Sequence, residues 1–260
     1  MSNIVEIRDV TLTCENKRIF NKLSFDIEGG SFVTIMGANG SGKSRLAHIL
    51  YGILPYFGSV KIAGKVITEQ TVEEIRKNVG IVFENPENLF VTDNVLEELS
   101  YSAISEKDID YIVKKFGINH LLRRKLSSLS SGEKQLVSLA CAIVSRPLVL
   151  VLDEGINMLD CYNKAKVMNV LRQYNKKGLT VINITQNSED LLYGNRVILF
   201  DNGDIVLNES LKEALLNDKI FVNAHINLPF MADLCTKLKY YDLIQKIELD
   251  RVRLVNSIWK

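Results

Sequence analysis

One short segment constrains the fold of this chain more than any other: a glycine-rich loop that directly follows an apolar run. The loop reads Gly37-Ala38-Asn39-Gly40-Ser41-Gly42-Lys43-Ser44 and fits the pattern G-x-x-x-x-G-K-[ST]. The apolar run 32–36 precedes it, and residues at helical spacing follow it, namely Leu46, Ala47, Ile49 and Leu50. A strand, a glycine loop and a helix in this order let backbone N–H groups hold phosphate oxygens at the positive end of a helix. The flanking elements argue against a turn that fits the pattern by chance.

The side chains at the end of this loop are suited to a nucleotide phosphate. Lys43 can reach the β- and γ-phosphates, and the Ser44 hydroxyl can be a ligand of Mg²⁺. A second motif, Asp153-Glu154, follows the apolar run 148–152. On its own it would be interpreted as a solvated strand end. Together with the loop it favours Asp153 as a magnesium ligand and Glu154 as the general base that activates water.

Further apolar runs predict an α/β fold. Residues 79–83, 148–152, 180–184 and 197–200 are nearly continuous in apolar character and are separated by helical stretches, which indicates a parallel sheet covered on both faces. Alternation in the first thirty residues predicts strands there. Residues 93–146 contain apolar residues at helical spacing (Val95, Leu96, Leu99, Ile109, Ile112, Val113, Phe116), and Glu133–Ser145 is expected to be a further helix. Asn202-Gly203 predicts a hairpin turn, and residues past about 220 predict a small helical appendage.

Charge, apolar run length and cysteine spacing argue against several classes of protein. Lysine and arginine number 32 against 31 acidic residues, a net charge of +1, which argues against binding to nucleic acid through bulk charge. No apolar run approaches the roughly 18 residues that would cross a bilayer. The first residues do not form a signal peptide. The four cysteines are scattered, which predicts reduced thiols in a cytosolic protein.

A third motif, Leu129-Ser130-Ser131-Gly132-Glu133-Lys134-Gln135, lies between the loop and the acidic strand end. Here the sequence resembles the ABC-type ATPases, whose signature is LSGGQ. Residues 82–86 lie where that family has its glutamine loop, 157–160 where it has the D-loop, and Gln186 where it has the switch histidine. The resemblance implies a P-loop NTPase fold with a RecA-like parallel sheet core, an N-terminal antiparallel β subdomain, a helical insertion (about 88–135) and a C-terminal appendage (221–260) after an ATPase domain (1–220).

Two stretches narrow the resemblance to the ATPases of energy-coupling-factor transporters. Residues 83–90 are similar to their "FQNPDNQ-F" stretch, and Asn227-Leu228-Pro229-Phe230 is similar to the "GL-x-x-P" segment that opens their dimerisation region. The resemblance implies ATP and Mg²⁺ as cofactors, and a homodimer or heterodimer with a second ABC ATPase. It also implies docking on a transmembrane T component with a substrate-binding S component, at the cytoplasmic face of the membrane, for uptake of a vitamin or of cobalt or nickel ions.

The resemblance also assigns roles to residues of this chain. The signature residues, Ser130, Ser131, Gly132 and Glu133, would bind the nucleotide held by the partner, with a helix N-terminus against the γ-phosphate. Glu84, Glu154 and Gln186 would serve catalysis, while Ser44, Asp153 and Glu84 would hold Mg²⁺. Leu89, Phe90 and Val91 either meet the T component or simply pack the insertion.

The sequence departs from the family pattern at four positions. Glu84 replaces a glutamine and places a negative charge beside the γ-phosphate. Gln186 replaces a histidine, and its amide can donate a hydrogen bond but carries no charge and passes no proton. Ser131 replaces a glycine. Cys14 stands where an aromatic residue would stack on adenine, and Phe20 is either a substitute or a core residue.

These departures predict binding of Mg-ATP with weakened hydrolysis. In the alternative interpretation they compensate for one another and turnover is normal. The leading hypothesis is a transport ATPase subunit. A second is a nucleotide-binding regulatory subunit that closes on ATP and barely hydrolyses it. A third, a soluble ABC ATPase of DNA repair or translation, is disfavoured because such proteins carry two cassettes or a long coiled-coil insertion.

Overall fold

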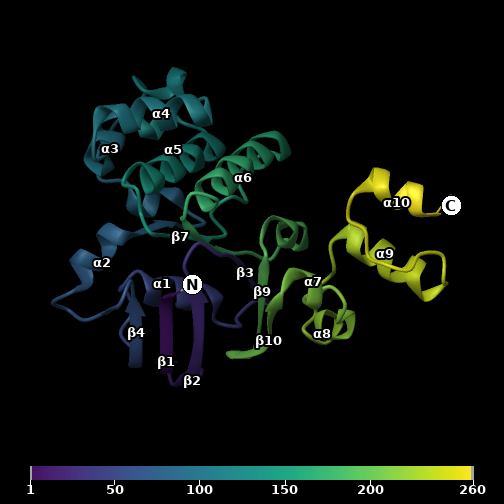
Figure 1. Ribbon diagram of the computed structural model, residues 1–260. Helices are drawn as coiled ribbons and strands as arrows, with labels where there is room; N and C mark the ends of the chain where they lie inside the picture. The colour runs from purple at the N-terminus through teal and green to yellow at the C-terminus, as the bar shows by residue number, and fades with distance from the viewer. Residues whose placement is uncertain (1, 259–260) are drawn as a thin grey trace.

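A six-stranded sheet forms the centre of the computed structural model, which describes residues 2–258 (Figure 1). Its strand order is β10-β9-β3-β8-β7-β6, and all neighbours pair in parallel except β10 with β9. Strands β3, β6, β7 and β8 are buried along their whole length, which explains their continuous apolar sequence. The strands are β3 (Phe32–Gly37), β6 (Val79–Val82), β7 (Val149–Asp153), β8 (Thr180–Ile184), β9 (Arg196–Asp201) and β10 (Asp204–Ser210).

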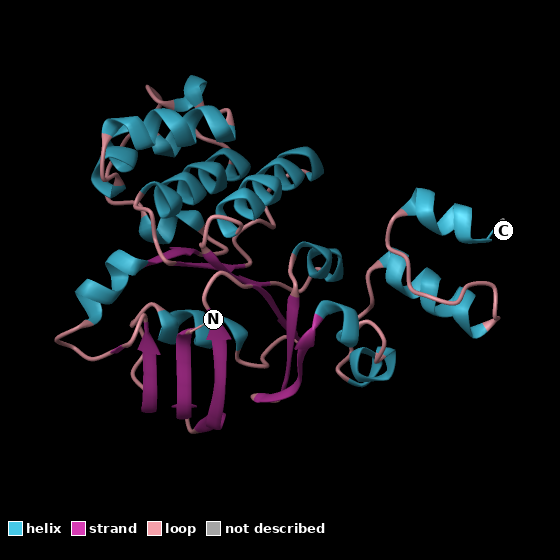
Figure 2. Cartoon of the chain, in the orientation of Figure 1, coloured by secondary structure: helices cyan, strands magenta, loops and turns pink. Residues whose placement is uncertain are grey.

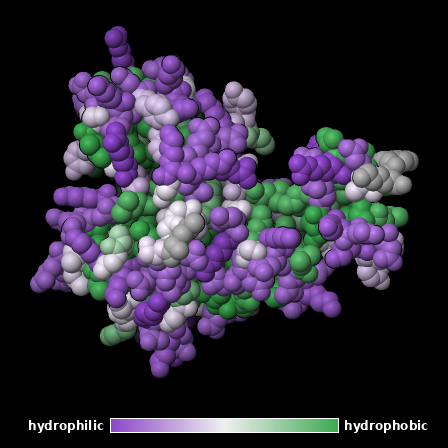
Figure 3. Space-filling view, viewed as in Figure 1, coloured by the Kyte–Doolittle hydropathy of each residue, from purple (hydrophilic) through white to green (hydrophobic). Residues whose placement is uncertain are grey.

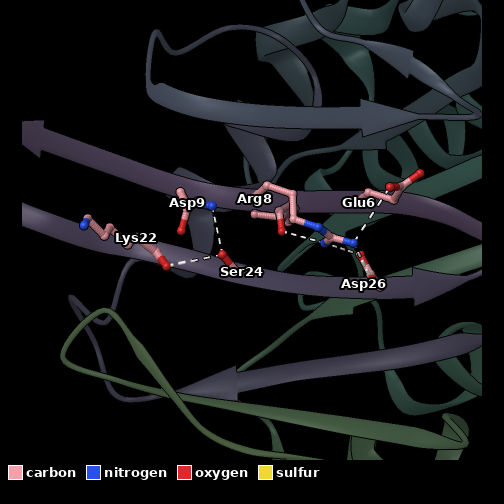
Figure 4. A network of polar contacts seen from close by, with 7 residues as sticks. Glu6, Arg8, Asp9, Lys22, Ser24 and Asp26 are labelled. Carbon is pink, nitrogen blue, oxygen red and sulfur yellow. Dashed lines mark hydrogen bonds and ion pairs between the residues drawn. The ribbon is translucent and has the colours of Figure 1, made fainter.

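A second sheet is antiparallel and comes from the N-terminal part of the chain. Its order is β2-β1-β4-β5, with β1 (Asn3–Cys14), β2 (Lys17–Glu28), β4 (Phe57–Ile62) and β5 (Lys65–Val66). One face of β1 and β2 is buried and the other carries polar contacts (Figure 4). There the Arg8 guanidinium donates to Asp26 at 2.9 Å, and the Asp9 N–H donates to the Ser24 hydroxyl at 2.8 Å. The predicted N-terminal strands are confirmed.

Helices cover both faces of the central sheet, as the sequence predicts (Figure 2). Val33 and Ile35 face one side, with the antiparallel sheet, α1 (Lys43–Leu50) and α2 (Val72–Asn78). Phe32 faces the other side, with α3 (Val95–Ser102), α4 (Glu106–Phe116), α5 (Ser131–Val144) and α6 (Cys161–Asn175). Because successive side chains of a strand point to opposite faces of the sheet, each face packs into a hydrophobic core of its own.

The helical insertion differs from its sequence prediction at two points. Leu96 was grouped with the apolar residues at helical spacing, yet its side chain is 45% exposed, because Val95 and Leu99 occupy the inward stripe at i and i+4. Helix α5 begins at Ser131, two residues before the predicted start. Ser130 caps it: the Ser130 N–H donates to the Glu133 carboxylate at 2.8 Å, and the Glu133 N–H donates to the Ser130 hydroxyl at 3.3 Å. The short 3-10 helices are η1 (Pro86–Leu89), η2 (Asn119–Leu121), η3 (Leu126–Ser128) and η4 (Ser188–Tyr193).

The predicted hairpin and helical appendage complete the chain. Asn202 and Gly203 both have left-handed backbones, with φ of 48° and 86°, as a two-residue turn between β9 and β10 requires. The helices that follow are α7 (Leu211–Ala214), α8 (Asp218–Asn223), α9 (Phe230–Tyr240) and α10 (Arg251–Ile258). Phe221 and Ile226 pack with β3 and β9, whereas α9 and α10 share a small cluster of their own around Cys235 and Leu254. Within residues 2–258, no helix combines the length and apolar character needed to span a bilayer.

Candidate nucleotide site

The glycine-rich loop joins β3 to α1 at the carboxyl edge of the central sheet, as the sequence predicts. Gly42 has a left-handed backbone, with φ of 100°, and a Cβ added to it would lie 2.6 Å from the ring of Phe20. Both the conformation and the close approach therefore require glycine at this position. Phe20 itself is fully buried and packs beside Phe200. Phe20 is thus a core residue, and its interpretation as a substitute for the adenine-stacking residue is wrong.

The Lys43 amine lies inside the loop. Its Nζ donates to the carbonyl oxygens of Gly37 at 2.8 Å and Ala38 at 2.9 Å. Burial lowers the pKa of Lys43, while the charges of Glu154 and Asp153 act in the opposite direction. Nζ also donates to the Ser41 hydroxyl at 3.3 Å. An ammonium held by these uncharged oxygens gains from a phosphate oxygen, since hydrogen bonds between two charged groups are the stronger ones.

A hydroxyl and a carboxylate meet directly beyond Lys43. The Ser44 hydroxyl donates to Asp153 Oδ1 at 2.9 Å, which joins the first turn of α1 to the end of β7. Burial raises the pKa of Asp153, and this hydrogen bond partly offsets the rise. Hydroxyl and carboxylate oxygens are the ligands that Mg²⁺ prefers, and two of them leave octahedral positions for phosphate and water. The residues present therefore fit a magnesium ion.

Glu154 follows in an unusual environment. It is buried, and its backbone is left-handed with φ of 53°, a strained conformation for a residue with a side chain. The Asn157 amide donates to Oε2, whereas Oε1 has no hydrogen-bond partner among residues 2–258. Burial raises the pKa of Glu154. A buried carboxylate oxygen without a protein partner is suited to hold and deprotonate a water molecule.

Gln186 and Glu84 reach the same edge of the sheet. Gln186 follows β8 and lines a cavity of about 290 Å³ together with loop residues Gly37, Ala38 and Asn39. Glu84 follows β6; it is exposed, and its charge contributes to the raised pKa of Asp153. The structure therefore brings together six residues that the sequence singled out: Lys43, Ser44, Glu84, Asp153, Glu154 and Gln186.

The signature residues do not join this group. They form the start of α5, which covers the sheet face opposite α1 (Figure 1). Ser130 and Ser131 are exposed, and a Cβ on Gly132 would lie 3.2 Å from the carbonyl oxygen of Met158. Ser131 occupies the first helical position, outside the tightly packed interior. This exposed helix start is free to meet another molecule.

Two sets of contacts at the site were not evident from the sequence. Lys164 of α6 forms an ion pair with Asp190 of η4 at 2.8 Å, and Asp190 also accepts a hydrogen bond from the Thr185 hydroxyl at 2.9 Å. This pair fixes the segment that follows Gln186. Gln135 lies at the end of the signature motif, and its buried amide contacts two other loops. Partners 20 to 52 residues apart leave no local pattern that would reveal such contacts.

Comparison with known proteins gives the family. The sequence pattern described as "ABC transporter" matches residues 20–157, more than half of the chain. The chain therefore belongs to the ABC transporter ATP-binding family, and it is an ATP-binding subunit of an ABC transporter. The fold that the sequence resemblance implied is confirmed by this match and by the solved structures of the family.

Individual relatives cover nearly the whole chain. The energy-coupling factor transporter ATP-binding protein EcfA1 of Bacillus licheniformis is 32% identical over 98% of this chain and 96% of its own length. EcfA of Malacoplasma penetrans is 31% identical over 98% and 93%. The structure of CbiO1 from Clostridium perfringens, part of the ABC transporter complex CbiONQ, has a TM-score of 0.74 at 27% identity and covers 90% of this chain and 99% of its own. The resemblance to energy-coupling-factor ATPases is thereby confirmed.

One solved relative is a dimer. This ATP-binding cassette, in a post-hydrolysis state bound to ADP and phosphate, has a TM-score of 0.72 at 26% identity, and the match covers 80% of this chain and 98% of that one.

Proposed function

We propose that this chain is the ATP-binding subunit of an energy-coupling-factor importer, and that it hydrolyses Mg-ATP at a dimer interface to drive uptake of a vitamin or a transition-metal ion. The observation that carries the catalytic part is the Ser44–Asp153 hydrogen bond beside the unpartnered oxygen of Glu154. The full-length similarity to EcfA proteins and to CbiO1 supports the type of transporter.

In this proposal each part of the site has one task. Backbone N–H groups of the loop and the Lys43 ammonium hold the phosphates, while Ser44, Asp153 and Glu84 hold Mg²⁺. A magnesium ion held there would supply Lewis-acid stabilisation of the phosphate charge. Glu154 orients a water molecule and accepts its proton. Gln186 donates a hydrogen bond to the γ-phosphate.

The site is completed by a second ABC ATPase, either an identical chain or a different one. Residues Ser130–Glu133, of which Ser130 and Ser131 are exposed, present a helix N-terminus, and such a terminus stabilises phosphate charge. Two copies that exchange these segments close on two nucleotides, and hydrolysis releases them. The dimeric cassette with ADP and phosphate supports this arrangement.

Substituting Glu154 by Gln in the purified transporter tests the proposal. The variant keeps the size of the side chain and loses the base, so turnover should collapse while an ATP-bound dimer accumulates on a sizing column. Glu209→Gln, at an exposed position of the edge strand β10, is the matched control and should behave as wild type. Undiminished turnover in Glu154→Gln would refute the assigned base.

A regulatory subunit with little hydrolysis is the second candidate, because Gln186 and Glu84 replace the family's residues on the same nucleotide. We propose a weakened site in this chain, paired with a better one. Restoring histidine at position 186 should then raise the ATPase rate of the complex. An unchanged rate in Gln186→His would contradict the weakened site and favour compensation among the substitutions.

A groove of about 570 Å³ is our candidate contact for the transmembrane T component. Leu89 and Phe90 are half-buried and pack on the two cores, and Val91 is 67% exposed; all three line the groove, as does Tyr101 of α3. Of these three residues, only Val91 offers an exposed side chain for this contact, whereas Leu89 and Phe90 are packed. A T component docked here would recruit an S component and hold the ATPase at the cytoplasmic face of the membrane.

The C-terminal segment 221–260 is our candidate dimerisation region, after an ATPase domain of residues 1–220 with a helical subdomain at about 88–135. Figure 3 shows hydrophobic patches among hydrophilic ones over the C-terminal helices. In this segment Phe230, Tyr240 and Tyr241 are 66%, 82% and 71% exposed. Exposed aromatic side chains of this kind mark contact surfaces.

A further inference from the structure

Gln135 joins two loops that carry catalytic residues. Its side chain is fully buried, and its Nε2 donates to the carbonyl oxygen of Phe83 at 3.2 Å and to that of Gly155 at 2.7 Å. Phe83 directly precedes Glu84, and Gly155 directly follows Glu154. Both hydrogens of one amide group therefore connect the two segments.

The contact lies where the sheet opens. Strands β6 and β7 pair with each other up to Val82 and Leu152, and beyond these residues the two segments no longer pair. A Cβ on Gly155 would lie 2.9 Å from the carbonyl oxygen of Val82, so the two loop starts are also in close contact. A buried carbonyl past the end of a ladder needs another donor, and the Gln135 amide supplies it for both loops.

The helix that carries Gln135 begins with the signature residues, of which the two serines are exposed. Ser130–Glu133 lie within two turns of Gln135, and the capping box makes this helix start rigid. The neighbouring Lys134 adds a second connection, an ion pair with Glu87 in η1, just after Glu84. The start of α5 is thus fastened to the Glu84 loop by two consecutive side chains and to the Glu154 loop by one.

We propose that Gln135 is a positioning residue that couples the signature segment of a chain to Glu84 and Glu154 of the same chain. The proposal rests on the proposed function, in which Ser130–Glu133 bind the nucleotide of the partner subunit. Engagement of that nucleotide fixes the start of α5, and the two hydrogen bonds from Gln135 then set the geometry of the magnesium ligand and of the base. One chain's own site thereby responds to occupancy of the other site.

The test uses the full chain, purified with the proteins that accompany it from membranes. Gln135→Met keeps the length of the side chain and removes both donors. Ser138→Ala, also buried and one turn further along α5, is the matched control. For each variant we would measure the Kd for Mg-ATP, kcat, and hydrogen exchange of residues 83–86, 130–133 and 154–157 with and without ATP.

In Gln135→Met we expect a Kd within about twofold of wild type and a kcat lower by about ten- to a hundredfold, the size of effect that misplaced reacting groups produce. Protection by ATP should persist at 130–133 and be lost at 83–86 and 154–157. A purely structural role would leave those protection patterns intact, and that outcome, or a kcat equal to that of Ser138→Ala, would overturn the proposal.

Lys134→Met keeps the proposal testable if Gln135→Met does not fold. Its ion-pair partner is exposed, so the fold should tolerate the change. We expect the same direction of effect at 83–86, with kcat lower by about twofold, and unchanged protection there would overturn the coupling. A wild-type complex that binds no Mg-ATP would instead refute the proposed function itself.

Discussion

The buried ion pair between Lys164 and Asp190 allows a prediction whose size can be worked out from the structure. Asp190 is 1% exposed and Lys164 is 14% exposed, with 2.8 Å between the charged atoms. Replacing Lys164 by Met removes the cation and leaves a carboxylate in a dry environment. The consequence should therefore be far larger than the loss of an ordinary surface contact.

Breaking a buried pair by removing one partner costs about 3–5 kcal/mol. The Thr185 hydroxyl still donates to Asp190 in the variant, so we expect the lower end of that range, about 3 kcal/mol. For a chain of this size each kcal/mol lowers the Tm by about 2–4 °C, which gives a decrease of about 6–12 °C.

Thermal unfolding followed by circular dichroism measures this decrease. Lys237→Met is the control, since Lys237 pairs with Asp233 at i and i+4 with both side chains well exposed, and should cost less than about 0.5 kcal/mol. The double variant Lys164→Met with Asp190→Asn should recover most of the lost stability, because no charge is then left unpaired. Equal Tm values for Lys164→Met and Lys237→Met would refute the reasoning.

Three further predictions concern the nucleotide site. Gly42→Ala should destabilise the fold by about 3 kcal/mol, because the added methyl group would meet the Phe20 ring at a position with a left-handed backbone. The same variant should bind a fluorescent ATP analogue more weakly. An unchanged Tm would contradict the packing argument. Burial raises the pKa of Glu154 above its ordinary value of 4.5, so stability falls as pH rises from that ordinary value up to the raised pKa and stays lower above it. Glu154→Gln should therefore have a higher Tm than wild type at neutral pH without nucleotide, and the gain should vanish below about pH 4.5, where Glu154 is protonated in both the folded and the unfolded protein. The same raised pKa places the acidic limb of the ATPase pH profile above pH 4.5, and a limb at or below the ordinary value of glutamate would argue against Glu154 as the base.

The central strands could be predicted because their burial leaves a direct mark on the sequence. Residues 180–184 are a strand with the predicted bounds, since a strand covered on both faces needs apolar residues at nearly every position. Helix starts were less accurate. The start of α5 depends on a capping box, a polar pattern outside the apolar stripe on which the prediction relied.

Antiparallel strands β4 and β5 were not predicted. Residues 57–66 contain two glycines and two lysines, and it is the pairing with β1, for example of Val5 with Ile62, that makes a strand of this segment. The burial of Phe20 also could not be predicted, because it depends on packing against Gly42 and Phe200, which lie far away in the chain.

By itself the sequence determined which residues can do the chemistry: a glycine loop ending in Lys43-Ser44, and the acids Asp153-Glu154 behind an apolar strand. These are local patterns, and the chemistry of phosphate and magnesium dictates them. Only the tertiary structure decided how these residues are held. Burial leaves Glu154 Oε1 without a hydrogen-bond partner among the described residues. The Lys164–Asp190 pair and the two hydrogen bonds of Gln135 join segments that meet through sheet pairing and helix packing, and such contacts leave no trace in the spacing of a linear chain.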